Sequence, residues 1–320
     1  MKLIIQIPCL NEEQTLPAVL QDLPKKIDGI DVIETMVIDD GSSDRTVETA
    51  KRLGVTHIIS LKRNQGLARA FSTGIHECLK RGADIIVNTD GDNQYQGACI
   101  KDLVQPVVAG KLDVVVGARP IMKIDEFSFV KKILQKIGSW VVRMVSNTTI
   151  PDATSGFRAY SKEAALQLVV TDRFTYTLDT LIQAGNSAYL HVGHVNIDTN
   201  PKTRESRLFH GIYHYITKSM RTIVQMFVYY KPFTFFLWIS CLFFVFELAI
   251  GVRFILNIYL FHIPDRTYVP SLILMSIFAV FGVGALLAGI LGSLFSKTRV
   301  LAMENIYLNR KILLEKNSRQ

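Results

Sequence analysis

In the first two thirds of the chain, short apolar runs alternate with longer stretches in which apolar residues recur every three or four positions. Short runs are typical of buried strands, and the periodic stretches are typical of helices that pack on a sheet. This rhythm predicts an α/β domain with a mostly parallel sheet and helices on both of its faces. We expect strands at residues 3–7, 32–38, 57–61, 83–87, 113–117 and 186–195, and helices at about 12–23, 45–53, 66–80 and from about 162.

Local signals refine two parts of this pattern. Asn11 stands where it would cap the first helix, and the hydroxyls of Ser42 and Ser43 stand where they would cap the second. Residues 127–147 interleave lysines and an arginine with apolar side chains, which indicates a basic amphipathic helix. That helix either packs on its own domain or lies on a membrane surface.

The last third of the chain has a different pattern, because its apolar residues form long, nearly uninterrupted runs. Residues 233–252 are almost wholly apolar apart from one glutamate, and residues 269–295 contain no charge. A membrane-spanning helix needs about 20 apolar residues, so both runs are expected to span a bilayer as a hairpin. The predicted organisation is the α/β domain at 1–207, an interfacial amphipathic helix at 208–232, membrane helices at 233–256 and 269–295, and a basic cytosolic tail at 296–320.

Composition and charge agree with a membrane protein. The hydrophobic fraction of 49% and the mean hydropathy of +0.24 are high for a soluble protein. The net charge of +8 is more typical of lysines and arginines on the cytosolic side of a membrane than of nucleic-acid binding. Basic residues flank both predicted spans, which places the catalytic domain and the tail in the cytosol, at the plasma membrane of a prokaryote or the endoplasmic reticulum of a eukaryote. The four cysteines show no paired spacing, which argues against a disulfide framework or a zinc site.

Small residues form two lines along the second predicted span, one through Gly284, Ala288 and Gly292 and one through Ala285, Gly289 and Ser293. Such lines favour close helix packing in membranes. The partner is either the first membrane helix or another copy of the chain, so the sequence leaves homo-oligomerisation through these helices open.

Polar loops follow three of the expected strands, at Asn11–Glu13, Asp39–Ser43 and Asp90–Gln94. The ends of parallel strands meet at one edge of a sheet, which is where α/β proteins bind their ligands. Asp90, Asp92 and Gln94 offer only oxygen ligands, and such a set suits Mg²⁺ or Mn²⁺ shared with substrate phosphates.

The adjacent carboxylates of Asp39 and Asp40 repel each other unless something neutralises or hydrogen-bonds them. A nucleobase and a ribose, which offer N–H and hydroxyl groups, would do so. The chain has neither Gly-x-Gly-x-x-Gly after its first strand nor Gly-x-x-x-x-Gly-Lys, so dinucleotide and P-loop sites lose support.

Taken in order, the loop motifs resemble those of family 2 glycosyltransferases of the GT-A fold. Within that family they are most similar to dolichyl-phosphate mannosyltransferases and bacterial polyprenyl-phosphate glycosyltransferases. The matching residues are Pro8-Cys9-Leu10-Asn11-Glu12, Asp39-Asp40-Gly41-Ser42, Asn64-x-Gly66, Asp90-Gly91-Asp92-Asn93-Gln94, Gly117-Ala118-Arg119 and Asp152-Ala153-Thr154-Ser155-Gly156-Phe157-Arg158. Thr203 to Arg207 resembles the Arg-x-x-Gly-x-Ser-Lys acceptor loop of that branch, although Arg207 stands where a lysine is usual.

The resemblance implies a role for each matching residue. Nucleotide-sugar binding is implied for Pro8, Asn11, Glu12, Asp39, Asp40, Asp90 and Gly91; metal binding for Asp90, Asp92 and Gln94; catalysis for Asp92, Arg119, Arg204 and Arg207; and acceptor-phosphate binding for Arg158, Arg204 and Ser206. The cofactor implied is Mg²⁺ or Mn²⁺. The partners implied are a nucleotide-sugar donor, a polyprenyl-phosphate acceptor and a membrane, with no nucleic acid.

The activity implied is metal-dependent, inverting transfer of a hexose from a nucleotide sugar of the UDP-glucose or GDP-mannose type to a dolichyl or undecaprenyl phosphate at the cytosolic membrane face. No Glu-Asp pair stands where a general base would be, and a phosphate monoester needs none, since its second pKa lies near ~6. One alternative is a family 2 transferase with a glycolipid or polysaccharide acceptor. Another is a non-catalytic module that uses the hairpin to dock a partner. The sequence distinguishes neither the sugar nor the base.

Overall fold

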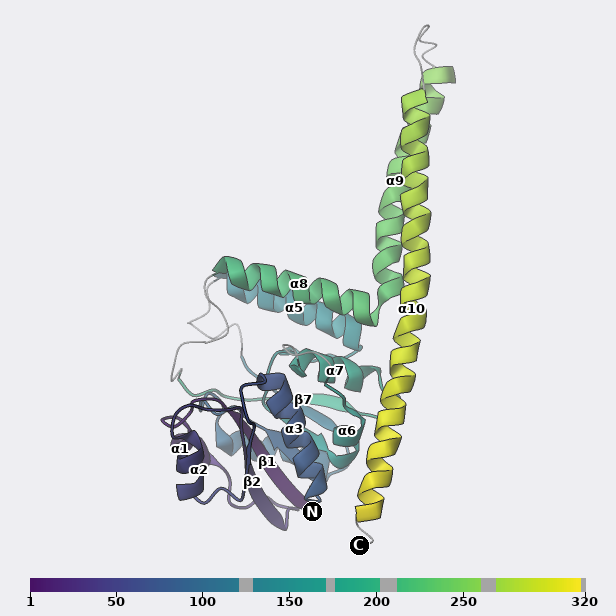
Figure 1. Ribbon diagram of the computed structural model, residues 1–320. Helices are drawn as coiled ribbons and strands as arrows, with labels where there is room; N and C mark the ends of the chain where they lie inside the picture. Colours follow the sequence, from purple (N-terminus) through teal and green to yellow (C-terminus); the bar gives the residue numbers. More distant parts are fainter. Residues whose placement is uncertain (121–128, 171–175, 202–211, 260–268, 318–320) are drawn as a thin grey trace. The chain divides into compact units, whose positions relative to one another are not determined.

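The computed structural model describes residues 1–120, 129–170, 176–201, 212–259 and 269–317, which form two compact units (Figure 1). The first unit comprises residues 1–219 together with 303–320, and the second comprises residues 220–302. The first carries the predicted α/β domain, and the second carries most of the apolar last third.

A seven-stranded sheet of order β3-β2-β1-β4-β6-β5-β7 forms the centre of the first unit. All pairings are parallel except those of β6 with its neighbours β4 and β5. The predicted mostly parallel sheet is therefore confirmed, and β6 is a strand that the hydrophobic pattern did not predict. The strands are β1 (Lys2–Cys9), β2 (Val32–Asp39), β3 (His57–Ser60), β4 (Ile85–Asn88), β5 (Val114–Ala118), β6 (Arg158–Ser161) and β7 (Val192–Asn196).

Helices cover both faces of this sheet, as the sequence predicts. Along β1, Leu3, Ile5 and Ile7 pack with α1, α2 and α4 in one core, whereas Ile4 packs with α3, α6 and α7 in the other. The helices are α1 (Leu16–Asp22), α2 (Thr46–Arg52), α3 (Leu67–Lys80), the short 3-10 helix η1 (Gly97–Cys99), α4 (Ile100–Val108), α5 (Phe129–Ser146), α6 (Lys162–Gln167) and α7 (Tyr176–Asn186).

Two buried carboxamides interrupt the apolar strands at the centre of the sheet. Gln6 of β1 and Asn88 of β4 are in register and are both fully buried. The Gln6 amide donates a 2.9 Å hydrogen bond to Asn88 Oδ1. A buried amide costs free energy unless it is paired, so this contact joins the two strands just below their carboxyl ends.

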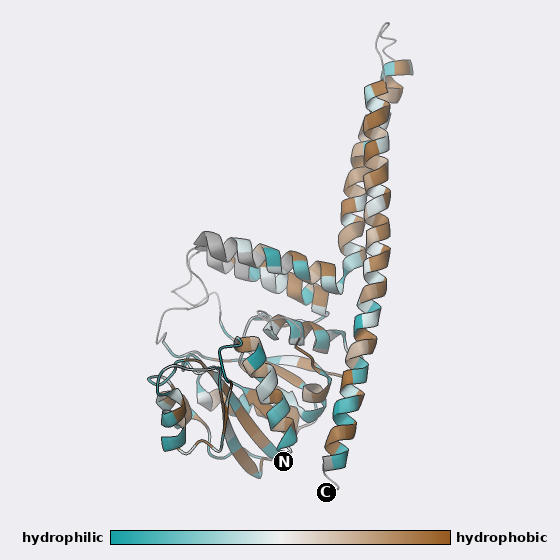
Figure 2. Cartoon of the chain, in the orientation of Figure 1, coloured by the Kyte–Doolittle hydropathy of each residue, from teal (hydrophilic) through white to brown (hydrophobic). Residues whose placement is uncertain are grey.

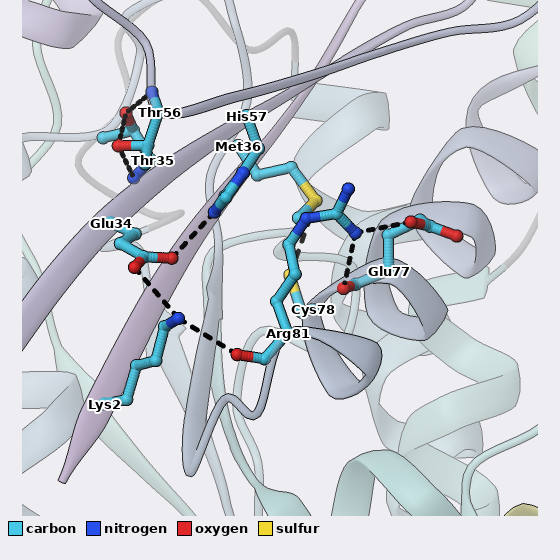
Figure 3. A network of polar contacts seen from close by, with 9 residues as sticks. All are labelled: Lys2, Glu34, Thr35, Met36, Thr56, His57, Glu77, Cys78 and Arg81. Atoms are coloured by element: carbon cyan, nitrogen blue, oxygen red, sulfur yellow. Dashed lines mark hydrogen bonds and ion pairs between the residues drawn. The ribbon is translucent and has the colours of Figure 1, made fainter. Parts of the chain in front are cut away.

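The opposite edge of the sheet carries a polar network that connects β1, β2, β3 and α3 (Figure 3). Glu34 forms an ion pair with Lys2 at 2.9 Å and contacts His57 at 2.7 Å. Lys2 Nζ also donates to the carbonyl of Arg81, after the end of α3. Burial opposes ionisation of Glu34, but its bonds to His57 and Lys2 outweigh this and lower the pKa of the carboxyl. Every group of this network has a partner in the protein, so we assign it a structural role.

The predicted helix caps are wrong at both sites. The first helix begins at Leu16, and Asn11 has a φ of +53° in the loop before it. Asn11 Oδ1 instead accepts from the amide of Ser43, in the loop after β2. At the start of α2, Asp44 accepts from the amide of Thr46. Asn11 therefore connects two loops to each other, and at α2 it is Asp44, rather than Ser42 or Ser43, that bonds an amide of the first turn.

The basic amphipathic helix is confirmed as α5, and one of its faces packs on its own domain. Val141, Val142 and Val145 are buried, and the helix contacts α7. On another face, Ile137 and Trp140 remain exposed. The helix therefore packs on its own domain, which is the first of the two alternatives. The exposed stripe of Ile137 and Trp140 remains available for the second, contact with a membrane surface.

The second unit contains two helices long and apolar enough to cross a membrane (Figure 2). They are α9 (Pro232–Tyr259) and the first part of α10 (Val269–Asn317), and α8 (Ile212–Tyr230) precedes them. In α10, Gly289 approaches Phe233 and Phe236 of α9, and Gly292 approaches Pro232. Two of the predicted small residues, Gly289 and Gly292, therefore pack on α9, which is the first of the two partners that the sequence left open.

The predicted tail is a continuation of α10, and its residues from 303 onward belong to the first unit. Tyr307 and Leu314 pack on the core beside α3 and α6. Arg310 Nη1 donates to the carbonyls of Leu166 and Leu168 at 3.1 and 2.9 Å. The last carbonyls of a helix have no partner inside it, so the tail supplies that partner to α6.

The buried amide pair makes a prediction about Gly74 of α3. A Cβ at this position would lie 2.2 Å from Gln6 Oε1 and 2.8 Å from Ile38 Cδ1. Gly74→Ala should therefore lower the free energy of unfolding by about 1–3 kcal/mol. Gly138 of α5 is the matched control, because no described heavy atom outside the neighbouring backbone of its own helix lies within 4 Å of its Cβ position. Gly138→Ala should stabilise the helix by about 0.5–1 kcal/mol. Equal changes in thermal unfolding for the two variants would contradict this account.

Candidate functional site

The loops after β1, β2 and β4 meet at one edge of the sheet. They meet because β1 pairs in parallel with both β2 and β4. A Cβ at Gly91, in the loop after β4, would lie 3.1 Å from Cys9 Sγ, 3.2 Å from Glu12 Cγ and 3.5 Å from the Pro8 carbonyl oxygen. Pro8, Glu12 and Gly91, which the sequence assigns to one site, are therefore neighbours in the fold.

The loops after β1 and β2 hold each other through side chain to backbone bonds. Ser42 Oγ accepts from the amide of Asn11 at 2.9 Å, and Thr46 Oγ1 accepts from the amide of Glu12 at 2.8 Å. In the other direction, Asn11 Oδ1 accepts from the backbone amide of Ser43. The positions of the predicted nucleotide-binding residues on the two loops therefore depend on each other.

Asp39 and Asp40 are adjacent and buried, but they have different environments. Both oxygens of Asp40 accept backbone amides, from Gln65 and from Gly66, each at 2.8 Å. Asp39 accepts one amide, from Ser42, on Oδ1. No described residue bonds its Oδ2. Asp40 therefore holds the loop before α3 in place, whereas Asp39 keeps one oxygen for a ligand.

Asp90, Asp92 and Gln94 occupy the loop after β4, where all three side chains are half-buried. Asp92 Oδ1 accepts from the amide of Gln94 at 3.2 Å, which closes a tight turn. In the described ranges, no three His, Cys, Asp or Glu side chains form a metal-binding cluster. Two carboxylates and a carboxamide oxygen fit a hard divalent ion that takes its other ligands from water and phosphate.

Further carboxylates surround this loop. Burial is the main factor that raises the pKa of the Cys9 thiol well above its usual value, and the charges of Glu12, Asp39 and Asp90 add to the effect. Cys9 therefore stays a neutral, buried thiol. The same charges give this edge of the sheet a negative potential, which attracts a cation.

The segment after β7 pairs with the loop after β4. Tyr95 and Thr199 form an isolated antiparallel bridge. The backbone amide of Asn200 donates to the carbonyl of Gln94 at 2.9 Å, and its side chain donates to the carbonyl of Asn93. The next residues along the chain include Arg204, Ser206 and Arg207, which lie outside the described residues.

Arg119 lies beside this loop, and its guanidinium is bound by Asp152. Nε and Nη2 donate to the two carboxylate oxygens at 2.6 and 3.2 Å. The guanidinium also lies over the ring of Tyr95. Burial disfavours the charged form of Arg119, but Tyr95 and Asp152 outweigh this and raise the pKa of the guanidinium. The structure therefore places Arg119 near the predicted site, whereas its contact with a phosphate stays a prediction.

Arg158 does not fit the acceptor-phosphate role predicted for it. Its side chain is fully buried. The guanidinium donates to the carbonyls of Ala153, Ser155 and Thr177 at 2.6–2.8 Å and to Thr180 Oγ1 at 3.1 Å. These bonds connect the loop before β6 to α7, so Arg158 supports the site from behind instead of contacting a ligand.

The sequence analysis missed residues that lie directly below the loop after β4. Asn88 Nδ2 donates to the carbonyl of Gly156 at 2.8 Å and to the hydroxyl of Tyr176 at 3.4 Å. The amide of Gly156 donates to the hydroxyl of Tyr95, whose pKa burial raises to about 12. One signal was available: Gln6 and Asn88 are carboxamides within otherwise apolar runs. Nothing local marked Tyr176.

Comparisons with known proteins agree with this geometry. The model of the family described as glycosyl transferase family 2 matches residues 4–168. A UDP-N-acetylglucosamine–dolichyl-phosphate N-acetylglucosaminyltransferase of Methanococcus voltae is 29% identical over 217 residues, which cover 60% of this chain and 83% of that protein. An undecaprenyl-phosphate mannosyltransferase of Micrococcus luteus is 30% identical over 166 residues, which cover 50% of this chain and 66% of that protein.

A solved structure shows the same fold. Glucosyl-3-phosphoglycerate synthase from Mycobacterium tuberculosis, crystallised with Mn²⁺, UDP and glucosyl-3-phosphoglycerate, aligns with a TM-score of 0.54 and 18% sequence identity. The alignment covers 71% of this chain and 78% of that one. Together with the observed sheet, this likeness confirms the predicted GT-A-type fold.

The different environments of Asp39 and Asp40 can be tested by comparing the stability of variants in which each is replaced by asparagine. Asp40→Asn replaces one accepting oxygen with the NH₂ group of a carboxamide. This group is a donor, and it would face a backbone N–H that also donates. It should lower the free energy of unfolding by about 1–3 kcal/mol. Asp39→Asn keeps an oxygen for the Ser42 amide, so its effect should be below about 1 kcal/mol. Thermal unfolding of the two purified variants makes the comparison, and a larger loss for Asp39→Asn would contradict the assignment.

Proposed function

The chain belongs to glycosyl transferase family 2, and we propose that it transfers a hexose from a nucleotide sugar to a polyprenyl phosphate at the cytosolic face of a membrane. The observation that carries this proposal is the loop Asp90–Gln94. Its oxygen ligands lie at the carboxyl edge of the sheet, beside Asp39, in a chain that also has two apolar helices. Its relatives include transferases named for lipid-phosphate acceptors.

The donor would bind across the three loops at this edge. The open oxygen of Asp39 is suited to accept from the base or the ribose, and Pro8, Asn11 and Glu12 border the same space. Asp40 supports this site by shaping the next loop. The two relatives are named for different sugars, but both are named for a lipid-phosphate acceptor. The acceptor class is therefore supported, and the sugar and the base are left for experiment.

Asp90, Asp92 and Gln94 are the residues that would hold Mg²⁺ or Mn²⁺. When bound, the ion would neutralise the diphosphate and stabilise it as a leaving group. Mn²⁺ in the crystals of glucosyl-3-phosphoglycerate synthase supports the use of a divalent ion. The nearby Arg119 would help to orient phosphate while Asp152 holds its guanidinium in place.

The acceptor phosphate would attack the anomeric carbon directly, with inversion. A phosphate oxygen forms the new bond while the bond from that carbon to the nucleoside diphosphate breaks, and no proton has to move. Asp152, a carboxylate near the site, is fully buried and binds Arg119, so it is not placed to act as a base. Cations are needed instead. Arg204, Ser206 and Arg207 follow Asn200 closely in sequence, and Asn200 bonds the loop after β4, which supports a role for these three residues at the site.

Membrane attachment is supported by both units. The helices α9 and α10 have the length and composition of spans. In the first unit, the end of α10 packs on the catalytic domain through Arg310. A segment that follows two spans can contact the domain that precedes them only if both lie on the same side of the bilayer. The exposed stripe of α5 would lie on that surface.

The direct test offers radiolabelled UDP- and GDP-sugars to membranes that contain the protein, followed by extraction of labelled lipid. Transfer should occur with one donor class, require Mg²⁺ or Mn²⁺, and stop in EDTA. Labelled polysaccharide without labelled polyprenyl phosphate would favour the family 2 alternative. Metal-independent or absent nucleotide-sugar binding would favour a docking module.

Asp90→Ala should abolish this transfer, because the ion would lose one of its two carboxylates. Asp28→Ala is the matched control: Asp28 is an exposed carboxylate, and the one side chain that bonds it among the described residues, Gln105, does so at the backbone carbonyl. That variant should transfer at the normal rate. Near-normal turnover by Asp90→Ala, in protein with unchanged thermal unfolding, would contradict the proposed metal site.

The proposed orientation predicts a labelling pattern for single cysteines introduced at exposed Lys51, at exposed Glu304 and at Arg266, which lies between the two apolar helices in sequence. Cys99 and Cys241 are first replaced by serine. In sealed vesicles with the cytosolic face outward, an impermeant maleimide should label positions 51 and 304 directly. Position 266 should react only after detergent is added. Labelling of 304 together with 266, and not with 51, would contradict the hairpin.

A further inference from the structure

Below the proposed metal loop, a buried tyrosine faces one of the carboxylates. We propose that Tyr176 is a positioning residue, whose hydroxyl donates to the carboxylate of Asp90 and holds it in the orientation that binds the ion. This inference rests on the proposed function, because it assigns a support to that metal site.

Gly156 shows that the two groups lie near each other. A Cβ on this residue would lie 2.7 Å from the Tyr176 hydroxyl and 3.2 and 3.4 Å from the two oxygens of Asp90. The hydroxyl and the carboxylate therefore face the same small space, which is open only because residue 156 has no side chain. Gly156 itself is fixed, since its amide donates to Tyr95 and its carbonyl accepts from Asn88.

The hydrogen-bond roles at Tyr176 follow from those at Asn88. The two N–H groups of the Asn88 amide can only donate, so the Tyr176 oxygen accepts at 3.4 Å. The phenolic hydrogen then remains available for an acceptor, and the carboxylate of Asp90 lies across the space above Gly156. The Asn88 oxygen is in turn engaged by Gln6, at 2.9 Å. Gln6 therefore donates to Asn88, Asn88 donates to Tyr176, and the Tyr176 hydroxyl has its hydrogen available for Asp90.

The ring of Tyr176 has little freedom to move. It is 3% exposed, and it stacks on Phe71 of α3 with ring centroids 4.4 Å apart and planes at 30°. A hydroxyl on a locked ring costs little entropy when it donates. Outer groups that orient metal-binding carboxylates usually matter by ten- to a hundredfold in metal affinity. Tyr176 meets the conditions for such a group: it is buried, rigid and adjacent to a ligand.

Tyr160 provides a matched control. It is fully buried, and its ring contacts the same Phe71 edge-on at 5.9 Å. No described residue bonds its hydroxyl. Tyr160→Phe and Tyr176→Phe therefore remove the same atom from the same aromatic cluster, and only the second removes a group that faces Asp90.

The experiment measures Mn²⁺ affinity on the detergent-purified full chain, by electron paramagnetic resonance of free Mn²⁺, with UDP and separately with GDP present. Tyr176→Phe should bind Mn²⁺ about tenfold or more weakly than wild type. Tyr160→Phe should bind as wild type does, and Asp90→Asn should lose binding. In EDTA, thermal unfolding of Tyr176→Phe should match that of wild type.

The outcomes separate this inference from the function on which it rests. If wild-type protein binds no Mn²⁺ with either nucleotide, the proposed metal site itself fails. If wild type binds and Tyr176→Phe binds equally well, the positioning role is overturned and the metal site stands. Equal weakening by Tyr176→Phe and Tyr160→Phe would also overturn it, because the effect would then come from packing of the aromatic cluster.

Discussion

The parallel pairing of β1 with both β2 and β4 is the constraint on which the rest of the first unit depends. It carries three loops to one edge of the sheet, and it brings Gln6 next to Asn88 beneath them. A strand that ran the other way would send its loop to the opposite edge. The proposed donor site, its metal loop and the support below that loop therefore follow from one choice of strand direction.

The two edges of the sheet differ in how their charges are satisfied. At one edge, Glu34 has both Lys2 and His57 as partners (Figure 3). At the other, buried Asp39 keeps an oxygen that no described residue bonds. Incomplete satisfaction of a buried carboxylate reduces stability. It is expected where a ligand completes the set, so the second edge is the one that indicates function.

Sequence reasoning succeeded where the signal was local and failed where a partner came from elsewhere in the chain. The apolar runs gave β1, β2 and the two long apolar helices, and the order of motifs gave the family. Asn11 failed as a cap because its partner, Ser43, lies after another strand. Arg158 failed as an acceptor contact because three carbonyls from the loop before β6 and from α7 enclose it. Strand β6 was missed because its residues, Arg158-Ala159-Tyr160-Ser161, contain no apolar run.

The positions of the two predicted arginines affect how a donor would bind. Arg119 is bound by Asp152, and Arg158 is enclosed by carbonyl groups. Neither brings an uncommitted positive charge to an edge that already carries Asp39, Asp90 and Asp92. A nucleoside diphosphate would add more negative charge there, which supports the proposal that a divalent ion binds together with it. For the acceptor phosphate, also an anion, we propose Arg204 and Arg207 as the cations. The metal ion would thus act on the diphosphate of the leaving group. Arg204 and Arg207 would act on the acceptor phosphate, which is the nucleophile.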